Sequence, residues 1–425
     1  MVLIEQLNAP GVADRLSALS GLKQEIASGA RPCPQRLSDV NNHIHTTYSF
    51  SPYSPTKAVW MAYESGLATA GLIDHDSISG AQEFVEAGRI IGMPVTVGLE
   101  CRADVSKTPL AGKTVNNPDQ ASVVYMGIHG VPHTRIAEAE AFFKPYKEAR
   151  MVRNRKMVEN INRLLALHGV QLDFDRDVLP LSQYQAGGTV TERHILFALA
   201  HKLVKKYGRG ERLISFLRDS LKLPLPNKIF YYLSDPENPH YEYDLLGVLK
   251  SGFVASMYVD ATDECPDVRE VVRFADSIGA IAAYAYLGDV GDSVTGDKKA
   301  QKFEDDYLDL LFEVLQDVGF RAVTYMPTRN TPEQLKRLKS YCAKYHMFEI
   351  CGEDINTPRQ VFVCEALRHP EFSNLIEAAW ALIGHEILAS IDLSNAFLSE
   401  ETAKRFPDLA ERTKYFADFA RNVYR

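Results

Sequence analysis

The sequence has no long hydrophobic run and no closely paired cysteines. No stretch approaches the roughly 18 consecutive apolar residues of a membrane-spanning helix, so we predict none. The six cysteines are scattered without a CxxC pair, which predicts reduced thiols in a cytoplasmic protein. The N-terminal segment carries Glu5 and Asp14 instead of a continuous apolar core, which argues against a signal peptide.

An excess of positive charge is also missing. The 47 lysines and arginines are outnumbered by 55 aspartates and glutamates, which leaves a formal net charge of −8. This balance argues against a general nucleic-acid binder, although it leaves room for a local basic pocket. Hydrophobic residues make up 46% of the chain and charged residues 24%, as in ordinary globular proteins. There is no internal repeat and no low-complexity segment.

The run NNHIHTTYSF at 41–50 places two histidines one residue apart in a short strand-like stretch. Alternate residues of a strand face the same side, so His43 and His45 point together. Imidazole is the commonest side-chain metal ligand, which makes the pair a candidate metal site. A close pair among 12 histidines can equally arise by chance, so the rest of the chain has to decide.

Strands and helices alternate after this pair. Strands are predicted at 40–44, 69–73 and 94–98, with helices between them, one of them introduced by Ser54 and Pro55. This order is typical of a parallel sheet, which binds ligands at the carboxyl ends of its strands. Those ends carry the histidine pair, then Asp74-His75-Asp76, then Glu100. Three successive strands thus deliver metal-type ligands to one edge, which predicts a metal site there.

The alternation is interrupted and then resumes. A strand is predicted at 122–128 and a helical insertion at 131–190, packed over the carboxyl ends of the strands. More helices are expected at about 200–245, within a segment 191–369 that returns to the sheet. The remaining strands are predicted at 280–286, 320–326 and 347–351. The flanking segments are a leading helix and linker at 1–37, a first sheet part at 38–130 and a helical tail at 370–425.

Five short motifs together resemble the PHP family, named for polymerase and histidinol phosphatase. They are HIHTTYS, LIDHDS, GLE, TERHILFALA and CGEDIN. The resemblance covers roughly residues 38–130 and 186–360 and is nearest the nucleotide-bisphosphate phosphatase branch, which has a helical insertion. It implies an α/β fold, a distorted seven-stranded β/α barrel (TIM-like). It also implies a metal-dependent phosphoesterase with divalent transition metals such as zinc, manganese or iron.

The resemblance implies metal ligands residue by residue. The first metal would take His43, His45, Glu100 and Asp354, and all four are present. The second would share Glu100 and add His194 and a further histidine. That histidine falls at Val124 and is missing; His129 is near, but it alternates to the other face of a straight strand.

The third metal of the family is largely lost. His75 is present, but Phe50 and Asn356 occupy the places of its two partners, and Tyr286 replaces a histidine of the family. We therefore expect one or two ions. Asp76 is either a site residue or the cap of the helix that begins near Ser79. Tyr286 is either a core residue or a proton donor.

Cationic side chains are expected to replace the charge of the missing ion. The candidates for phosphate binding are Lys298, Lys299, Arg329 and Arg359, and Asp289 is a further candidate site residue. The predicted function is a phosphoesterase that acts on a small phosphorylated or nucleotide-like molecule through a metal-activated water. The alternatives are a catalytically inactive PHP-like binding protein, and hydrolysis of a different bond by Tyr286 and Asp289. The sequence predicts no oligomeric state.

Overall fold

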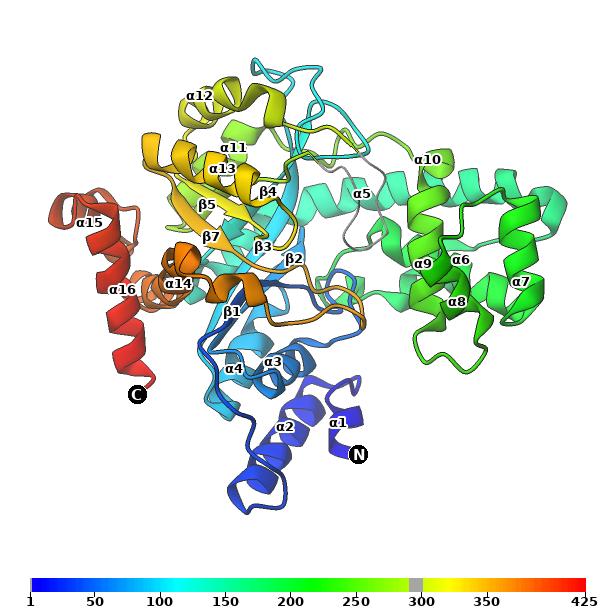
Figure 1. Ribbon diagram of the computed structural model, residues 1–425, viewed down its shortest axis with the longest axis horizontal. Helices are drawn as coiled ribbons and strands as arrows, with labels where there is room; N and C mark the ends of the chain where they lie inside the picture. Colours follow the sequence, from blue (N-terminus) through cyan, green and yellow to red (C-terminus); the bar gives the residue numbers. More distant parts are fainter. Residues whose placement is uncertain (1, 290–300) are drawn as a thin grey trace.

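Seven strands form one sheet in the computed structural model, which describes residues 2–289 and 301–425 (Figure 1). Their order in the sheet follows the sequence, so all seven predicted strands are confirmed. The strands are β1 (Val40–Ile44), β2 (Thr69–His75), β3 (Val95–Asp104), β4 (Val123–His129), β5 (Ile281–Ala285), β6 (Ala322–Tyr325) and β7 (Phe348–Cys351).

The sheet curls into a barrel that is almost closed. Strands β1 to β3 are parallel, as are β5 to β7, whereas β4 runs antiparallel to both of its neighbours. No strand pairing joins β1 to β7 in the described residues; the seam is bridged just beyond β7 by hydrogen bonds from His45 N to Ile355 O (3.0 Å) and from Ile355 N to His43 O (3.1 Å). The distorted, TIM-like β/α barrel is thereby confirmed. We call the edge at the carboxyl ends of the parallel strands the mouth.

Helices cover the outer face of the barrel. They are α3 (Pro55–Glu64), α4 (Ala81–Ile91), α11 (Val268–Ser277), α12 (Leu308–Val318) and α13 (Pro332–Lys344), beside the N-terminal pair α1 (Val2–Gln6) and α2 (Val12–Ala27). Ser54 caps α3 by accepting from Lys57 N at 3.0 Å, with Pro55 at the first helical position, as predicted. Trp60, Phe84 and Phe312 are fully buried in the core between these helices and the sheet.

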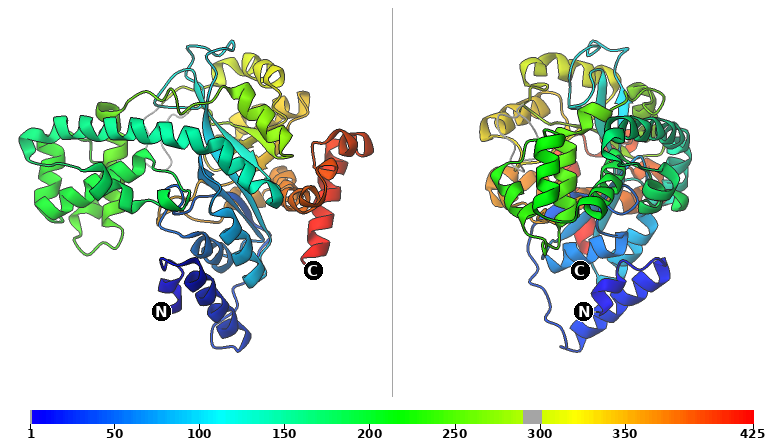
Figure 2. Two further views of the ribbon diagram at one scale, coloured as in Figure 1. Left: turned by 180° about the vertical axis from the view of Figure 1, so that it is seen from behind. Right: turned by 90° about the vertical axis from the view of Figure 1, so that its right-hand side faces the viewer.

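The end of the barrel opposite the mouth is packed by the C-terminal helices α14 (Ser373–Ile391), α15 (Glu400–Arg405) and α16 (Leu409–Val423). Helix α14 contacts β1, β3 and β7. Its buried Glu386 accepts a hydrogen bond from Val97 N at 2.8 Å and another from the Thr96 hydroxyl. Figure 2 shows these helices at the opposite end of the molecule from the insertion.

The insertion comprises α5 (Ile136–Leu165), α6 (Glu192–Tyr207), α7 (Glu211–Ser215), α8 (Asn227–Ser234), α9 (Tyr241–Gly252) and α10 (Val254–Met257). Helix α5 runs from the barrel into this unit (Figures 1 and 2). The prediction placed the insertion at 131–190 and further helices at about 200–245. Apolar residues of α5, α6 and α9 share one core, so the helical unit continues to Met257. No helix within the described residues is long and apolar enough to cross a membrane.

Candidate metal centre

Four predicted ligands meet inside the mouth. His43 and His45 lie at the end of β1, His75 ends β2, and Glu100 lies on β3. Glu100 is central: its Oε1 lies 2.9 Å from His75 Nδ1 and 3.4 Å from His45 Nε2, and its Oε2 lies 3.7 Å from His43 Nε2. One ligand atom each from His43, His45 and Glu100 lies within 4.8 Å of the others, a spacing that suits a single metal ion.

Asp354 approaches the same group from the loop after β7. Its Oδ1 lies 3.3 Å from His45 Nε2 and accepts a hydrogen bond from the Asn356 amide. Burial raises the pKa of Asp354, but the adjacent imidazoles of His45 and His43 outweigh it and leave the pKa well below its ordinary value. Asn356 therefore orients this carboxylate, in addition to occupying the place of a third-metal ligand.

Hydrogen bonds fix the tautomer of His45. The Asp74 carboxylate accepts from the Ser49 hydroxyl (2.5 Å) and from Thr46 N (2.7 Å), so the Ser49 oxygen is left to accept from His45 Nδ1 at 3.2 Å. The proton thus sits on Nδ1, and Nε2 presents its lone pair to Glu100 and Asp354. That buried Nε2 has no hydrogen-bond partner in residues 2–289 and 301–425, as expected for a metal ligand.

The electrostatics of the centre fit a cation. Burial raises the pKa of Glu100, but the charges of His75 and His43 hold it well below its usual range. Burial lowers the pKa of His43, but Glu100 and Asp354 raise it above its ordinary value. The buried Glu100 and the partly exposed Asp354, set among imidazoles, form a donor set typical of zinc, iron or manganese. The residues present therefore fit a divalent transition metal.

His194 adjoins the centre from the start of α6. Its Nδ1 accepts from Thr191 N at 3.0 Å in a capping box, and burial followed by the charge of Arg150 lowers its pKa to about 3. The charge of His75 also acts on His194. Phe50 packs edge-on against the His194 ring, with the ring centroids 5.0 Å apart, and belongs to the core of the insertion. The place of a third-metal ligand is thus filled by an apolar contact.

His129 faces the interior of the barrel, whereas Val124 packs in the core outside it. The two residues alternate as expected, and His129 is the one that turns toward His43 and Glu100. Its buried Nε2 finds no hydrogen-bond partner in the described part of the chain. Burial, followed by the charge of His43, lowers its pKa to about 3. His129 is therefore a neutral imidazole inside the barrel, close enough to His43 and Glu100 to feel their charges.

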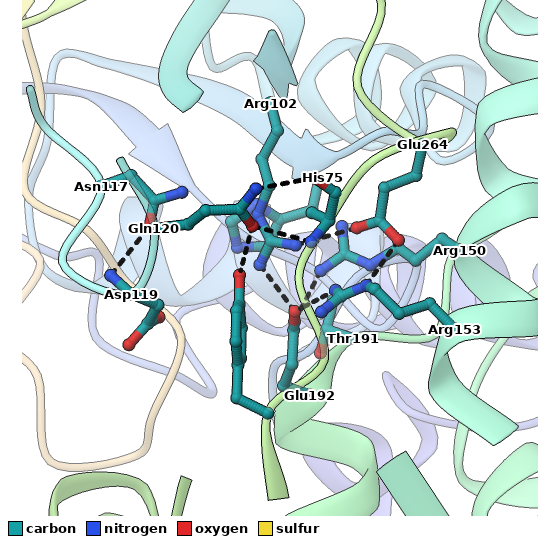
Figure 3. A network of polar contacts seen from close by, with 12 residues as sticks. His75, Arg102, Asn117, Asp119, Gln120, Arg150, Arg153, Thr191, Glu192 and Glu264 are labelled. Atoms are coloured by element: carbon teal, nitrogen blue, oxygen red, sulfur yellow. Dashed lines mark hydrogen bonds and ion pairs between the residues drawn. The ribbon is translucent and has the colours of Figure 1, made fainter. Parts of the chain in front are cut away.

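A buried network of arginines and carboxylates, missed in the sequence, borders the centre (Figure 3). Glu192 accepts from Arg102 and Arg150 at 2.6 Å each and also from Arg153. Glu264 accepts from Arg102 at 2.8 Å and from Arg153 at 2.6 Å. The only sequence signal was the basic run 147–156, which reads as a solvated helix face. These contacts join β3 to α5 and α6.

The capping role considered for Asp76 is not seen. Helix α4 begins at Ala81 after Gly80, which makes no side-chain cap. Asp76 instead pairs with Arg150, and its own backbone is left-handed, with φ at 51°. The carboxylate that follows His75 therefore belongs to the arginine network.

A cavity of about 500 Å³ opens from Asp354 toward the insertion. Five cationic residues line it: Arg193, Lys228, Lys250, Arg329 and Arg359. The Arg359 guanidinium is engaged by Asp244 of α9 at 2.6 and 2.8 Å, and Arg329 donates from Nε to Leu287 O at 3.2 Å. Arg193 was missed although it lies within the TERHILFALA motif, because the resemblance assigned a role only to its neighbour His194. Lys228 and Lys250 were missed because their helices carry no motif.

The other candidates lie near the end of β5. The Tyr286 ring is buried in the main core, where its hydroxyl donates to Asp305 Oδ1 at 2.5 Å. Asp289 accepts from Phe303 N at 2.6 Å and donates from its own N to Asp305 at 2.9 Å. Lys298 and Lys299 lie outside the described residues. The catalytic and phosphate-binding roles of these residues stay predictions.

Comparisons with known proteins agree with this fold. No protein-family model matches the chain. Over 58 residues it is 38% identical to a 5'-3' exoribonuclease of Haemophilus influenzae, which is 14% of this chain and 21% of that protein's length.

Two solved structures resemble about three quarters of the chain. One is a "putative metal-dependent phosphoesterase" from Bifidobacterium adolescentis, with a TM-score of 0.50, 19% identity and coverage of 77% of this chain and 94% of that one. The other is an amidohydrolase from Chromobacterium violaceum with bound sulfate, with a TM-score of 0.50, 17% identity and coverage of 76% and 89%. At these identities the likeness shows the fold alone, which this chain shares with one protein described as a phosphoesterase and one described as an amidohydrolase.

Proposed function

We propose that the protein is a metal-dependent phosphoesterase of the PHP family that acts on a small phosphorylated or nucleotide-like substrate. The observation that carries the proposal is the carboxylate of Glu100, ringed by three imidazoles and facing Asp354, at the end of a cavity lined with cations. The names of the two structural neighbours support hydrolysis, and the sulfate in one of them is an analogue of phosphate.

Different residues of the chain would bind the metal and the phosphoryl group. His43, His45, Glu100 and Asp354 would hold a divalent cation, with His75, His129 and His194 as candidates for a second. Such a cation lowers the pKa of a bound water to about 7 and polarises a phosphoryl oxygen. Arg329 and Arg193 lie on the cavity wall that Asp354 shares, where they would neutralise the phosphoryl oxygens. Lys298 and Lys299 remain proposed for the same role.

A catalytically inactive, metal-binding protein is the second candidate. The observation that favours it is the loss of the third site, where Phe50 has become part of the core of the insertion and Asn356 orients Asp354. The same metal centre would then bind a ligand without hydrolysing it.

Metal content and hydrolysis measured together test the proposal. We expect the purified protein to contain one or two equivalents of zinc, iron or manganese by mass spectrometry and to hydrolyse bis(p-nitrophenyl) phosphate or a nucleotide. His43→Ala combined with His45→Ala should remove the metal and the activity without changing the circular dichroism spectrum.

The matched control replaces the half-exposed His201 and the exposed His369 with alanine, which should change neither the metal content nor the activity. Full metal occupancy in the His43/His45 variant would refute the assigned centre. A metal-loaded protein that hydrolyses no phosphoester would favour the inactive alternative.

A further inference from the structure

Arg193 lies at the boundary between the metal centre and the cavity. It is the second residue of α6, between Glu192 of the arginine network and His194 of the centre. Its half-buried side chain lines the cavity together with Asp354 and Asn356. Its charge acts on Asp354, the carboxylate at the cavity end of the centre. A cation is thus placed where a substrate group would meet the metal ligands.

The backbone that carries Arg193 is held on both sides. Glu192 receives hydrogen bonds from Arg102 and Arg150, and the His194 imidazole closes the capping box with Thr191. Neither neighbour can shift without breaking buried polar contacts. The guanidinium therefore projects from a fixed point, which reduces the entropy lost when it binds a ligand.

The guanidinium itself has no hydrogen-bond or ion-pair partner among residues 2–289 and 301–425. Arg359, on the same cavity, shows the contrast, because Asp244 satisfies its guanidinium with two hydrogen bonds. A half-buried cation gains from an anion that accepts its hydrogen bonds. Among the described residues, no hydrogen bond or ion pair joins Arg193 to the Asp354 carboxylate, whose Oδ1 accepts from Asn356.

We propose that Arg193 is a substrate-binding residue that holds the phosphoryl group undergoing hydrolysis through two parallel N–H to oxygen hydrogen bonds. The inference rests on the proposed function, since it names the group that the cavity presents to the metal centre. A guanidinium fork matches two phosphoryl oxygens, whereas a lysine ammonium acts as a single point charge. The residue therefore favours a terminal phosphoryl group over a neutral ester or amide.

The test compares Arg193→Ala, Arg193→Lys and the control Arg212→Ala, which changes an exposed arginine of α7. Inorganic phosphate is the probe, titrated calorimetrically into the metal-loaded proteins. We expect Arg193→Ala to weaken phosphate binding at least about tenfold and to lower kcat/KM by about 10²-fold, the effect of losing one transition-state donor. Arg193→Lys should recover only part of both losses, and Arg212→Ala should behave as wild type. Metal content should be equal in all four proteins.

Each outcome decides between the two proposals. Phosphate affinity that is unchanged in Arg193→Ala, or no phosphate binding by the wild type, overturns the inference even if hydrolysis is intact. Loss of metal in Arg193→Ala overturns it as well, because the residue would then support the centre itself. Phosphate binding that depends on Arg193 in a protein without phosphoesterase activity upholds the inference and refutes the proposed function.

Discussion

Ser49 and Asp74 show how one hydroxyl group decides what a histidine can do. Ser49 donates to Asp74 and accepts from His45 Nδ1, which directs the unprotonated Nε2 toward Glu100 and Asp354. Neither Ser49 nor Asp74 is itself a candidate metal ligand. Residues of this kind raise the basicity of the ligand and restrict its orientation, and mutation of such a partner typically weakens metal affinity by about 10- to 100-fold.

Ser49→Ala should therefore weaken metal binding by about 10- to 100-fold while leaving the fold intact. The His45 ring would lose the acceptor that fixes its tautomer. Competition with a metallochromic chelator measures the affinity. Ser20→Ala is the control, since that hydroxyl only donates to Leu16 O within α2. Equal affinities for the two variants would contradict the role assigned to Ser49.

At the scale of elements, the arginine network holds the insertion against the barrel. Arg102 comes from β3, Arg150 and Arg153 come from α5, and Glu192 opens α6. Their side chains are almost wholly buried, so each charge depends on its partners. Removal of one member of a buried pair leaves the other charge uncompensated, which destabilises a protein by about 3–5 kcal/mol.

Glu192→Gln should lower the free energy of unfolding by about 3 kcal/mol, because three arginines would lose a carboxylate at once. Urea denaturation followed by circular dichroism measures this. The control is Glu86→Gln, which breaks the exposed pair with Arg89 and should change stability by less than about 1 kcal/mol. Similar values for the two variants would show that the network does not stabilise the fold.

For the molecule as a whole, a buried carboxylate links stability to pH. Glu304 is fully buried near the end of β5, where Oε1 accepts from Leu287 N (2.8 Å) and the Tyr284 hydroxyl (3.1 Å). Burial outweighs these hydrogen bonds and raises its pKa from 4.5 to about 7. The folded protein thus binds this proton more tightly than the unfolded chain, so stability falls as pH rises between the two values.

Glu304→Gln, which mimics the protonated acid, should remove this dependence. Between pH 4.5 and pH 7, ionisation of Glu304 lowers the free energy of unfolding of the wild type by roughly 3 kcal/mol. The free energy stays lowered by this amount above pH 7. The variant should then be more stable than wild type at pH 8 and nearly equal to it at pH 5, as measured by urea unfolding. Glu313→Gln, at an exposed position of α12, is the control. Parallel pH profiles of Glu304→Gln and wild type would refute the ionisation of Glu304.

The sequence by itself determined the features that depend on near neighbours. Alternation along β1 turned His43 and His45 to one side, and parallel strands brought their polar ends, with His75 and Glu100, to one edge. Ser54 marked the start of α3, since a cap bonds to a backbone group only three residues away. Periodicity and capping act within a few residues, and so they can be predicted from a single sequence.

Only the tertiary structure decided which distant groups meet. Arg102 and Glu192 are 90 residues apart, and nothing in their surroundings in the sequence pairs them. His129 faces inward because the register of β4 pairs Gly127 with Glu100, and residues two apart on a strand share a face. The helices up to Met257 belong together because they share one core. Arg193 stood out only when the partners of its neighbours were known. Such contacts depend on the packing of whole elements, which no local pattern encodes.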